Sequence, residues 1–146
     1  MRVVLQRVSE ASVTVDGNRI SSVGPGFLLL VGVGKGDDDA TAERMAGKIS
    51  RLRVFEDARG KMNLDVSRVN GEALSVPQFT LLGSTEKGNR PGFDGAADPA
   101  EAERLWKRFN DALKEAGITV KEGEFGARME VSLVNDGPVT FVLDSE

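Results

Sequence analysis

Residues 27–33 read FLLLVGV and are the strongest indication of the fold in this chain. It is continuously apolar and lacks the polar alternation of a strand with one face in water. Gly24-Pro25-Gly26 precedes it and marks a turn. We therefore predict a buried central strand, around which the other elements are arranged.

Weaker strand patterns lie on both sides of this segment. Arg2 to Val8 and Ser12 to Val15 are rich in Val and alternate with polar residues, which is typical of half-buried strands. Asp16-Gly17 is a hairpin signal that predicts a return strand at residues 19–23. Further strands are predicted at residues 53–56, 72–82, 118–122, 129–134 and 139–143. Pro77 indicates an edge or an irregular backbone within the second of these.

Two helices are predicted from apolar residues with helical spacing. The first begins at the acidic residues 37–39, and the second begins at Asp98 with Pro99 at its first position and Glu101 completing a capping box. Gly117 ends the second helix. The buried positions are Ala42, Met45, Ala46, Ile49 and Leu52 in the first helix, and Leu105, Trp106, Phe109, Leu113 and Ala116 in the second. We predict one α/β domain over residues 1–146, strand-dominated and barrel-like, with two main helices packed on the sheet.

The amino-acid composition excludes several classes of catalytic site. The 146 residues include no Cys, no His and no Tyr. A Ser-His-Asp triad, a Cys-His dyad, a His-ligated metal and a tyrosyl acid are therefore impossible within one type of chain. An enzyme built from this sequence must use carboxylates, Lys or Arg, hydroxyl and amide side chains, or backbone N–H groups aimed at a developing charge.

The charge and the glycine-rich segments argue against several partners. The net charge of −4 and the pI near 5.0 do not suit a nonspecific nucleic-acid binder, so we expect no DNA partner and only a local RNA contact. No apolar run approaches the ~20 residues of a membrane span, and the N-terminal segment is no export signal; we expect a cytoplasmic protein without a membrane partner. Residues 32–36 lack the Ser or Thr of a phosphate-binding loop, and residues 37–39 suit a solvated helix start better than a cation site. We expect neither a metal nor another cofactor.

Two segments carry side chains or backbone groups that suit a binding site. On a strand, Gln78 and Thr80 would point to one face and Phe79 to the other, and Pro77 could leave a backbone N–H free as an oxyanion donor. On the pattern alone, an ordinary edge strand is the favoured interpretation. Residues 135–138 read Asn-Asp-Gly-Pro, which indicates a hairpin turn, although a proline here also allows a cis bond that would turn two carbonyls toward one ammonium group.

With other stretches of the chain, these segments resemble the bacterial and eukaryotic D-aminoacyl-tRNA deacylase family. The resemblance covers essentially the whole chain, in order and without large gaps. It is carried by MRVVLQRVSEASVTVDG (1–17), GKMNLDV (60–66), QFTL (78–81), KGNRPGF (87–93) and NDGPVT (135–140). It implies hydrolysis of the ester between a D-amino acid and the terminal adenosine of tRNA, with glycine also accepted.

The resemblance also implies a homodimer in which each site uses both chains. Gly137 and Pro138, joined by a cis bond, are expected to reach the partner's pocket, where their carbonyls bind the α-amino group and exclude L side chains. Gln78, Phe79 and Thr80 are expected to line the pocket that holds the adenosine and the scissile ester at the 3′ acceptor end.

The missing His also bears on the mechanism. A threonine without a general base is poorly activated, so we do not expect Thr80 to be the nucleophile. The backbone N–H groups of Phe79 and Thr80 are expected to stabilise the oxyanion, while the 2′-hydroxyl of the tRNA helps to activate water. Arg7 is expected to brace the Gly-Pro segment.

One departure from the family pattern leaves other functions open. Pro77 stands where the family usually has Ser, and a related group of deacylases with Pro-Gln and a trans Gly-Pro bond acts on L-alanine misattached to tRNA. Phe79 is closer to the D-specific type, because that group has Ala there. A deacylase that edits L-alanine and a non-catalytic module that binds the tRNA end are the alternatives.

Overall fold

The segment 27–33 forms the centre of the main sheet in the computed structural model of the protein, which describes residues 1–145. Its strand, β3, lies between β1 and β6 in the order β2-β1-β3-β6-β7, and β8 pairs with β1. The strand bounds are β1 Arg2–Val15, β2 Asn18–Val23, β3 Gly26–Gly32, β4 Phe55–Glu56, β5 Met62–Leu64, β6 Glu72–Pro77, β7 Thr119–Glu122 and β8 Glu130–Asp144. The helices are α1 Asp39–Arg51, α2 Pro99–Glu115 and the short 3₁₀ helices η1 Val66–Val69 and η2 Phe79–Leu82. The prediction of a strand-dominated α/β fold with two main helices is confirmed.

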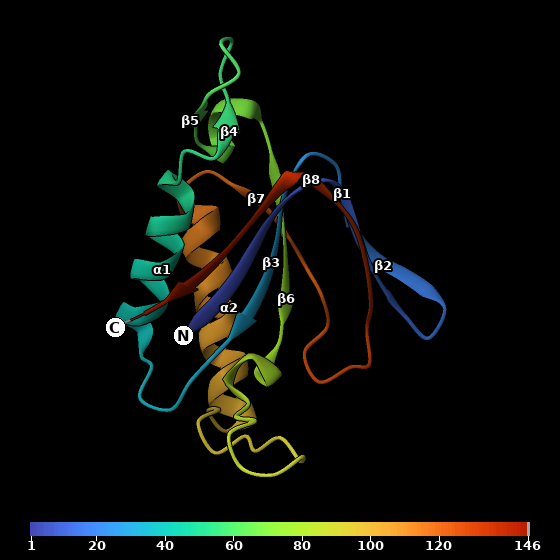
Figure 1. The fold of residues 1–146 in the computed structure, drawn as a ribbon, viewed down its shortest axis with the longest axis vertical. Helices are drawn as coiled ribbons and strands as arrows, with labels where there is room; N and C mark the ends of the chain where they lie inside the picture. Colours follow the sequence, from blue (N-terminus) through green and yellow to red (C-terminus); the bar gives the residue numbers. More distant parts are fainter. Residues whose placement is uncertain (146) are drawn as a thin grey trace.

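The central strand is buried on both faces because a different apolar cluster covers each one. One side packs against α1 and α2, which lie side by side on the same face of the sheet (Figure 1). The other side packs inside the curl of the sheet. The first cluster includes Leu5, Phe27, Ile49, Trp106 and Phe109, and the second includes Val8, Val13, Leu28, Leu74 and Val76.

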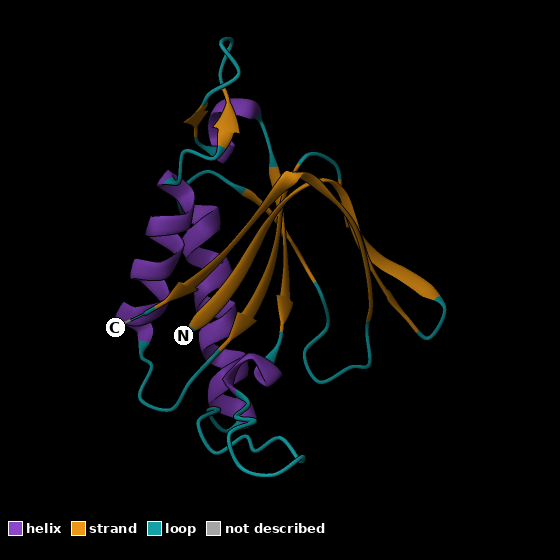
Figure 2. Cartoon of the chain, in the orientation of Figure 1, coloured by secondary structure: helices purple, strands orange, loops and turns teal. Residues whose placement is uncertain are grey.

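The two longest strands, β1 and β8, bend together and give the sheet its barrel-like curl (Figure 2). One half of β1 pairs with β3 and the other half with β2, while β8 follows β1 along most of its length. Register shifts at Gln6/Val8 and Val8/Glu10 mark bulges, which bend a strand without ending it.

These bulges explain where the strand predictions were wrong. The strands expected at residues 2–8 and 12–15 are one strand, and so are those expected at 129–134 and 139–143. The hairpin expected at Asp136-Gly137 is therefore absent from β8. The hairpin at Asp16-Gly17 is confirmed, with both residues at positive φ.

The helix starts were predicted more accurately than their hydrogen bonds. Asp38 caps α1, accepting from the Thr41 N–H at 2.9 Å while the Thr41 hydroxyl accepts from the Asp38 N–H at 3.3 Å. Asp98 and Pro99 start α2 as predicted, but Asp98 makes no side-chain cap. The expected capping box is wrong because Glu101 pairs with Arg104 instead, at 2.7 Å.

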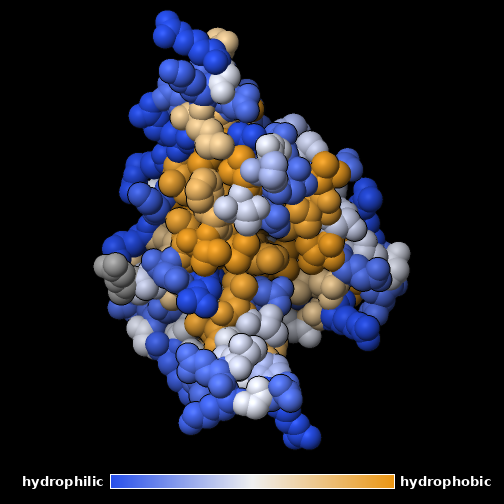
Figure 3. All heavy atoms as spheres, in the orientation of Figure 1, coloured by the Kyte–Doolittle hydropathy of each residue, from blue (hydrophilic) through white to orange (hydrophobic). Residues whose placement is uncertain are grey.

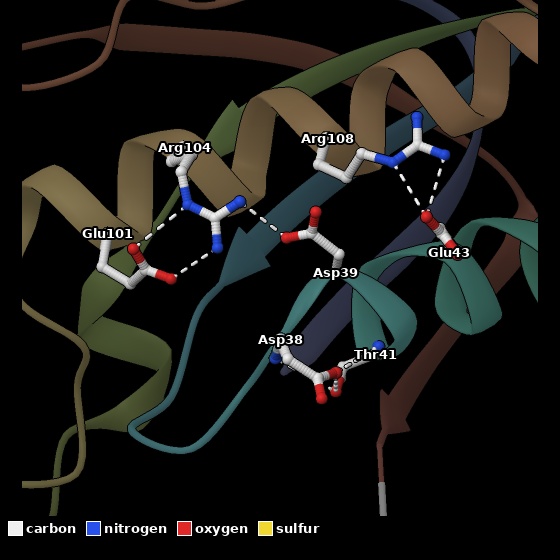
Figure 4. Close-up of polar contacts among 7 residues, drawn as sticks. All are labelled: Asp38, Asp39, Thr41, Glu43, Glu101, Arg104 and Arg108. Carbon is white, nitrogen blue, oxygen red and sulfur yellow. Dashed lines mark hydrogen bonds and ion pairs between the residues drawn. The ribbon is translucent and has the colours of Figure 1, made fainter.

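Ion pairs connect the exposed sides of the two helices (Figure 4). Arg104 joins Asp39 of α1 at 2.6 Å, and one turn further along α2 Arg108 joins Glu43 at 3.0 Å. Such exposed pairs contribute little individually, and the apolar contacts beneath them carry most of the packing.

Apolar side chains also reach the surface beside β8. Figure 3 shows them gathered in the middle of the face that β8 crosses. Val134, Phe141 and Val142 of this strand are exposed, and β8 pairs only with β1 in the described part of the chain. A long edge strand with exposed apolar residues is typical of a surface that meets a partner. Among residues 1–145, no helix combines the length and apolarity that a membrane crossing requires.

Candidate active site

The segment that carries Gln78, Phe79 and Thr80 lies where β6 leaves the sheet. Pro77 pairs with Val31 of β3 and lies beyond the last residue that β7 pairs, so no strand there needs its missing N–H. The Gln78 N–H donates to the Val31 carbonyl at 2.8 Å, and the chain then turns into η2. The strand predicted over residues 72–82 therefore ends at Pro77, and the expected irregular backbone follows it.

The turn brings the Gln78 and Thr80 side chains together. The amide Nε2 of Gln78 donates a hydrogen bond to the Thr80 hydroxyl, which leaves that hydroxyl oxygen serving as an acceptor. The two side chains therefore meet, as predicted, although the strand has already ended: Gln78 precedes the helical turn η2, and Thr80 lies within it. Phe79 is directed away from the core, with 57% of its surface exposed.

The backbone N–H groups of Phe79 and Thr80 are unpaired at the start of η2. Neither donates a hydrogen bond to another of residues 1–145. The first N–H groups of any helical turn lack a partner within it, so they are available to an anionic oxygen. The sequence-based expectation of unused N–H donors at this point is met.

A largely apolar cavity of about 440 Å³ opens beside this turn. Gln78 and Phe79 lie at its edge, the start of α2 and the end of β3 form its walls, and the segment that precedes β8 closes it. The buried Trp106 also lines it, and its indole N–H donates to the Ser75 hydroxyl at 2.9 Å. The described residues hold no cluster of acidic, His or Cys side chains suited to a metal ion.

The second predicted segment is held by Arg7. Arg7 is only 4% exposed, and its Nη1 donates to the Val54 carbonyl at 2.7 Å. Its Nε donates to the Asp136 carbonyl at 3.3 Å and lies 3.4 Å from the Asp136 carboxylate. The Asn135 amide donates to the carbonyls of Arg7 at 3.0 Å and Val139 at 3.1 Å. Arg7 and Asn135 thus fix the segment from both ends.

Gly137 is required where it stands. Its φ of +113° is disfavoured for residues with a side chain, and a Cβ at this position would collide with the Arg7 guanidinium. Gly137 and Pro138 are both exposed, so the segment presents its backbone to the outside of the molecule.

The expectation of a cis bond between Gly137 and Pro138 is wrong for this structure. Every peptide bond among residues 1–145 is trans. Both residues belong to the continuous strand β8, and a trans bond lets that strand run past the bulge between the partners of Gln6 and Val8 without reversing. The two-carbonyl arrangement that a cis bond would create is therefore not formed.

One chain does not bring the two segments together. Arg7, beneath Gly137, pairs with Phe27 at the start of β3, whereas Pro77 pairs with Val31 at its other end. The intervening strand spans roughly 13 Å at the usual rise per residue. A site that uses both segments needs a second copy of the chain.

The family profile described as D-Tyr-tRNA(Tyr) deacylase matches residues 4–144. This chain belongs to that family. Within the D-Tyr-tRNA(Tyr) deacylase family, a D-aminoacyl-tRNA deacylase of Thermomicrobium roseum is 59% identical over 145 residues, covering 99% of this chain and 94% of the relative.

Two solved structures share the fold of this chain. A c-Myc DNA unwinding element binding protein matches with a TM-score of 0.93 and 42% identity, over 100% of this chain and 99% of the other. A probable eukaryotic D-amino acid tRNA deacylase matches with a TM-score of 0.83 over 97% of both chains. At 18% identity this second likeness shows the fold alone.

Sequence reasoning missed several contacts in and around this family member's site. Phe93 packs edge-on against Phe79 with ring centroids 5.1 Å apart, although nothing in the spacing of the two residues indicates a contact. Ser75 and Trp106 come from different elements, and their contact depends on how α2 packs on β6. The pairing of Asn135 with the backbone of Arg7 similarly depends on the register of β8 against β1.

Proposed function

We propose that this chain hydrolyses the ester between a D-amino acid, or glycine, and the terminal adenosine of tRNA, as a deacylase of the cytoplasm. Membership of the D-Tyr-tRNA(Tyr) deacylase family supports this function, and curated relatives are named D-aminoacyl-tRNA deacylase. The observation that carries the mechanism is the pair of unpaired N–H groups at Phe79 and Thr80, beside the mouth of an apolar cavity.

In this mechanism the enzyme supplies an oxyanion site, and the nucleophile is water. Water attacks the ester carbonyl carbon, and the carbonyl oxygen gains negative charge that the Phe79 and Thr80 N–H groups stabilise. The bond from that carbon to the ribose oxygen then breaks, and the proton lost by water passes to the ribose oxygen. The neighbouring 2′-hydroxyl of the tRNA orients the water, because the sequence offers no His for that task.

Thr80 is assigned to positioning and not to nucleophilic attack. Its hydroxyl oxygen accepts from the Gln78 amide, and no basic side chain hydrogen-bonds to it among the described residues. A hydroxyl without a base at neutral pH is a weak nucleophile. Gln78 and Thr80 together hold the turn in the form that leaves both N–H groups open.

The cavity is assigned to the terminal adenosine. Its walls of Val, Pro, Met and aromatic side chains suit a purine ring, and its volume of about 440 Å³ lies within the ordinary range of small-molecule sites. An acidic protein that recognises only the acceptor end needs no broad basic surface. No cofactor is needed for an ester hydrolysis of this kind.

A homodimer completes the site in this proposal. The exposed apolar residues of β8 and its unpaired edge supply a surface for a second copy. That copy would bring its Gly137-Pro138 segment to the Gln78–Thr80 turn, where the two segments of one chain cannot meet. A backbone wall held rigid by Arg7 would leave no room for an L side chain while accepting the α-hydrogen of a D residue.

A second candidate function follows from two observations. Pro77 in place of the usual Ser, and the trans Gly137-Pro138 bond, are both features of the related deacylases that act on L-alanyl-tRNA. Phe79 opposes this assignment, because those deacylases have Ala at the same position. The distinction is therefore one of substrate chirality and not of reaction type.

The test is deacylation of matched D-Tyr-tRNA, L-Tyr-tRNA, Gly-tRNA and L-Ala-tRNA by the purified protein without added metal. We expect rapid loss of the D-Tyr ester and of glycine, with L-Tyr-tRNA spared. Preferential loss of L-alanine would establish the second candidate. Binding of tRNA without turnover of any ester, with Gln78→Ala changing only that binding, would indicate a non-catalytic module.

A further inference from the structure

Two exposed phenylalanine rings lie in contact beside the cavity. Phe79 lines the cavity edge, and its ring meets that of Phe93 at a centroid distance of 5.1 Å and an angle of 62°. Phe79 is 57% exposed and Phe93 is 36% exposed. Two large aromatic side chains that remain in contact with water beside a binding cavity are typical of a recognition surface.

The second ring is held in place by its surroundings. Phe93 packs against the α-carbon side of Gly83, where an added Cβ would lie 2.9 Å from the ring. The loop between them is closed by paired backbone hydrogen bonds of 2.7 and 2.9 Å between Ser84 and Gly92. Phe93 is thus a preformed feature of the surface, and its ring has little entropy to lose on binding.

The same closed loop carries two positive charges. Lys87 and Arg90 lie between Ser84 and Gly92, both are exposed, and neither forms an ion pair with any described residue. Glu86 lies in the same loop and Asp94 follows it directly, so the loop is not a broad basic patch. A pair of unpaired cations beside exposed aromatic rings is the combination that binds single-stranded nucleic acid.

We infer that Phe93 is the stacking platform for the base that precedes the terminal adenosine of tRNA, with Lys87 and Arg90 against the adjoining phosphates. The inference rests on the proposed function, which places the terminal adenosine in the cavity. Phe79 lines the cavity and is exposed, so a preceding nucleotide that leaves the cavity along Phe79 meets Phe93 as the next ring. Any base can stack on an aromatic face, and the two cations favour a ligand with a phosphate backbone.

The decisive comparison uses two D-Tyr esters, one on intact tRNA and one on adenosine alone. Phe93→Leu is expected to raise KM for the tRNA ester about tenfold, in line with the usual strength of base–aromatic stacking, and to leave hydrolysis of the adenosine ester unchanged. An equal loss on both esters would overturn the inference, because Phe93 would then act only by supporting Phe79. Unchanged hydrolysis of both would overturn it as well.

A tRNA lacking only the base of the penultimate nucleotide supplies a matched control. With this substrate the KM of the wild type should rise about tenfold, and Phe93→Leu should raise it no further, because the stacking partner is already missing. Additive losses would contradict the inference. Lys87→Gln should reduce the salt dependence of tRNA binding, whereas Lys61→Gln, on the β4–β5 hairpin, should not.

Failure of the proposed function would be recognised separately. If the wild type cleaved neither ester, the deacylase assignment would fall, and binding of a short RNA with a single-stranded CCA end would then decide the present inference. Weaker binding by Phe93→Leu that disappears with the penultimate base removed would support it. Equal binding by wild type and variant would overturn it.

Discussion

Arg7 Nη1 donates a 2.7 Å hydrogen bond to the carbonyl oxygen of Val54, in the interior of the protein. The same guanidinium contacts Asp136. One buried cation therefore links Val54, which follows α1, to the segment that carries Gly137. Burying an arginine is costly unless its donors are satisfied. The arrangement makes the shape of the 135–138 segment depend on Arg7.

Arg7→Met should therefore lower the free energy of unfolding by about 2–3 kcal/mol, since a charged hydrogen bond is lost and the Val54 carbonyl is left without its partner. Urea denaturation measures the change. Arg19→Met is the matched control, because Arg19 is exposed and forms no ion pair with the described residues. It should shift stability by less than about 0.5 kcal/mol. Equal effects of the two substitutions would contradict the bracing role.

Gly137→Ala should destabilise the chain by more than the strain of a positive φ alone. Gly117 also has a positive φ, of +90°, but nothing lies within 4 Å of a Cβ there. We expect Gly117→Ala to cost about 1 kcal/mol and Gly137→Ala clearly more, because only the latter displaces the Arg7 guanidinium. Thermal unfolding of both variants makes the comparison. A Gly137→Ala variant no less stable than Gly117→Ala would show that Arg7 moves aside at no cost.

Acid should weaken the start of α1 through Asp38. The Thr41 backbone N–H donates to this carboxylate and holds the pKa of Asp38 below its ordinary value. A pKa that is lower in the folded state stabilises the protein above the unfolded value of about 3.9, and that contribution is lost as pH falls through the folded-state pKa. Asn is an equally good cap without a titrating group, so Asp38→Asn should reduce the slope of stability against pH below about 4. Urea unfolding of wild type and Asp38→Asn between about pH 2 and pH 6 measures these slopes. Identical dependence of the free energy of unfolding on pH in the two proteins would contradict the prediction.

Most features encoded by neighbouring residues were predicted correctly, and features that depend on residues far apart in the sequence were not. The apolar run at 27–33, the helical periodicity and the Asp16-Gly17 turn are local, and each appears where expected. The continuity of β1 and β8 depends on bulges in a pairing between the two ends of the chain, which no local window contains. At residues 135–138 the turn signal was overridden by that pairing.

The candidate site was predicted in part for the same reason. Gln78 and Thr80 were correctly placed together, but not by the strand assumed: Gln78 has an extended φ just before η2, and its side-chain amide donates to the Thr80 hydroxyl at the start of that turn. The hydrogen bonds of Arg7 to the carbonyls of Val54 and Asp136, and the contact between Phe79 and Phe93, arise from packing between distant segments. The state of the Gly137-Pro138 bond is set by the strand around it, and the residue pair alone does not determine it.

Removing one backbone N–H should separate the oxyanion role of the turn from its side chains. Phe79 occupies the first position of η2, where proline is tolerated because the N–H has no helical partner. Phe79→Pro and Phe79→Ala both remove the ring, but only the proline removes the donor. We expect kcat of the proline variant for D-Tyr-tRNA to lie about 10²–10³-fold below that of the alanine variant, the usual effect of losing one oxyanion donor.

Single-turnover hydrolysis with saturating protein isolates the chemical step in this comparison. Circular dichroism and thermal unfolding of both variants control for the turn itself, because a proline that disrupted η2 would also break the Gln78–Thr80 hydrogen bond and lower stability. Thr80→Ala should lose far less than the proline variant, since it keeps the N–H and removes only a hydroxyl that accepts from Gln78. If Thr80→Ala instead abolished turnover while Phe79→Pro retained the rate of Phe79→Ala, the hydroxyl would be the nucleophile and the N–H groups would have no part in stabilising the transition state.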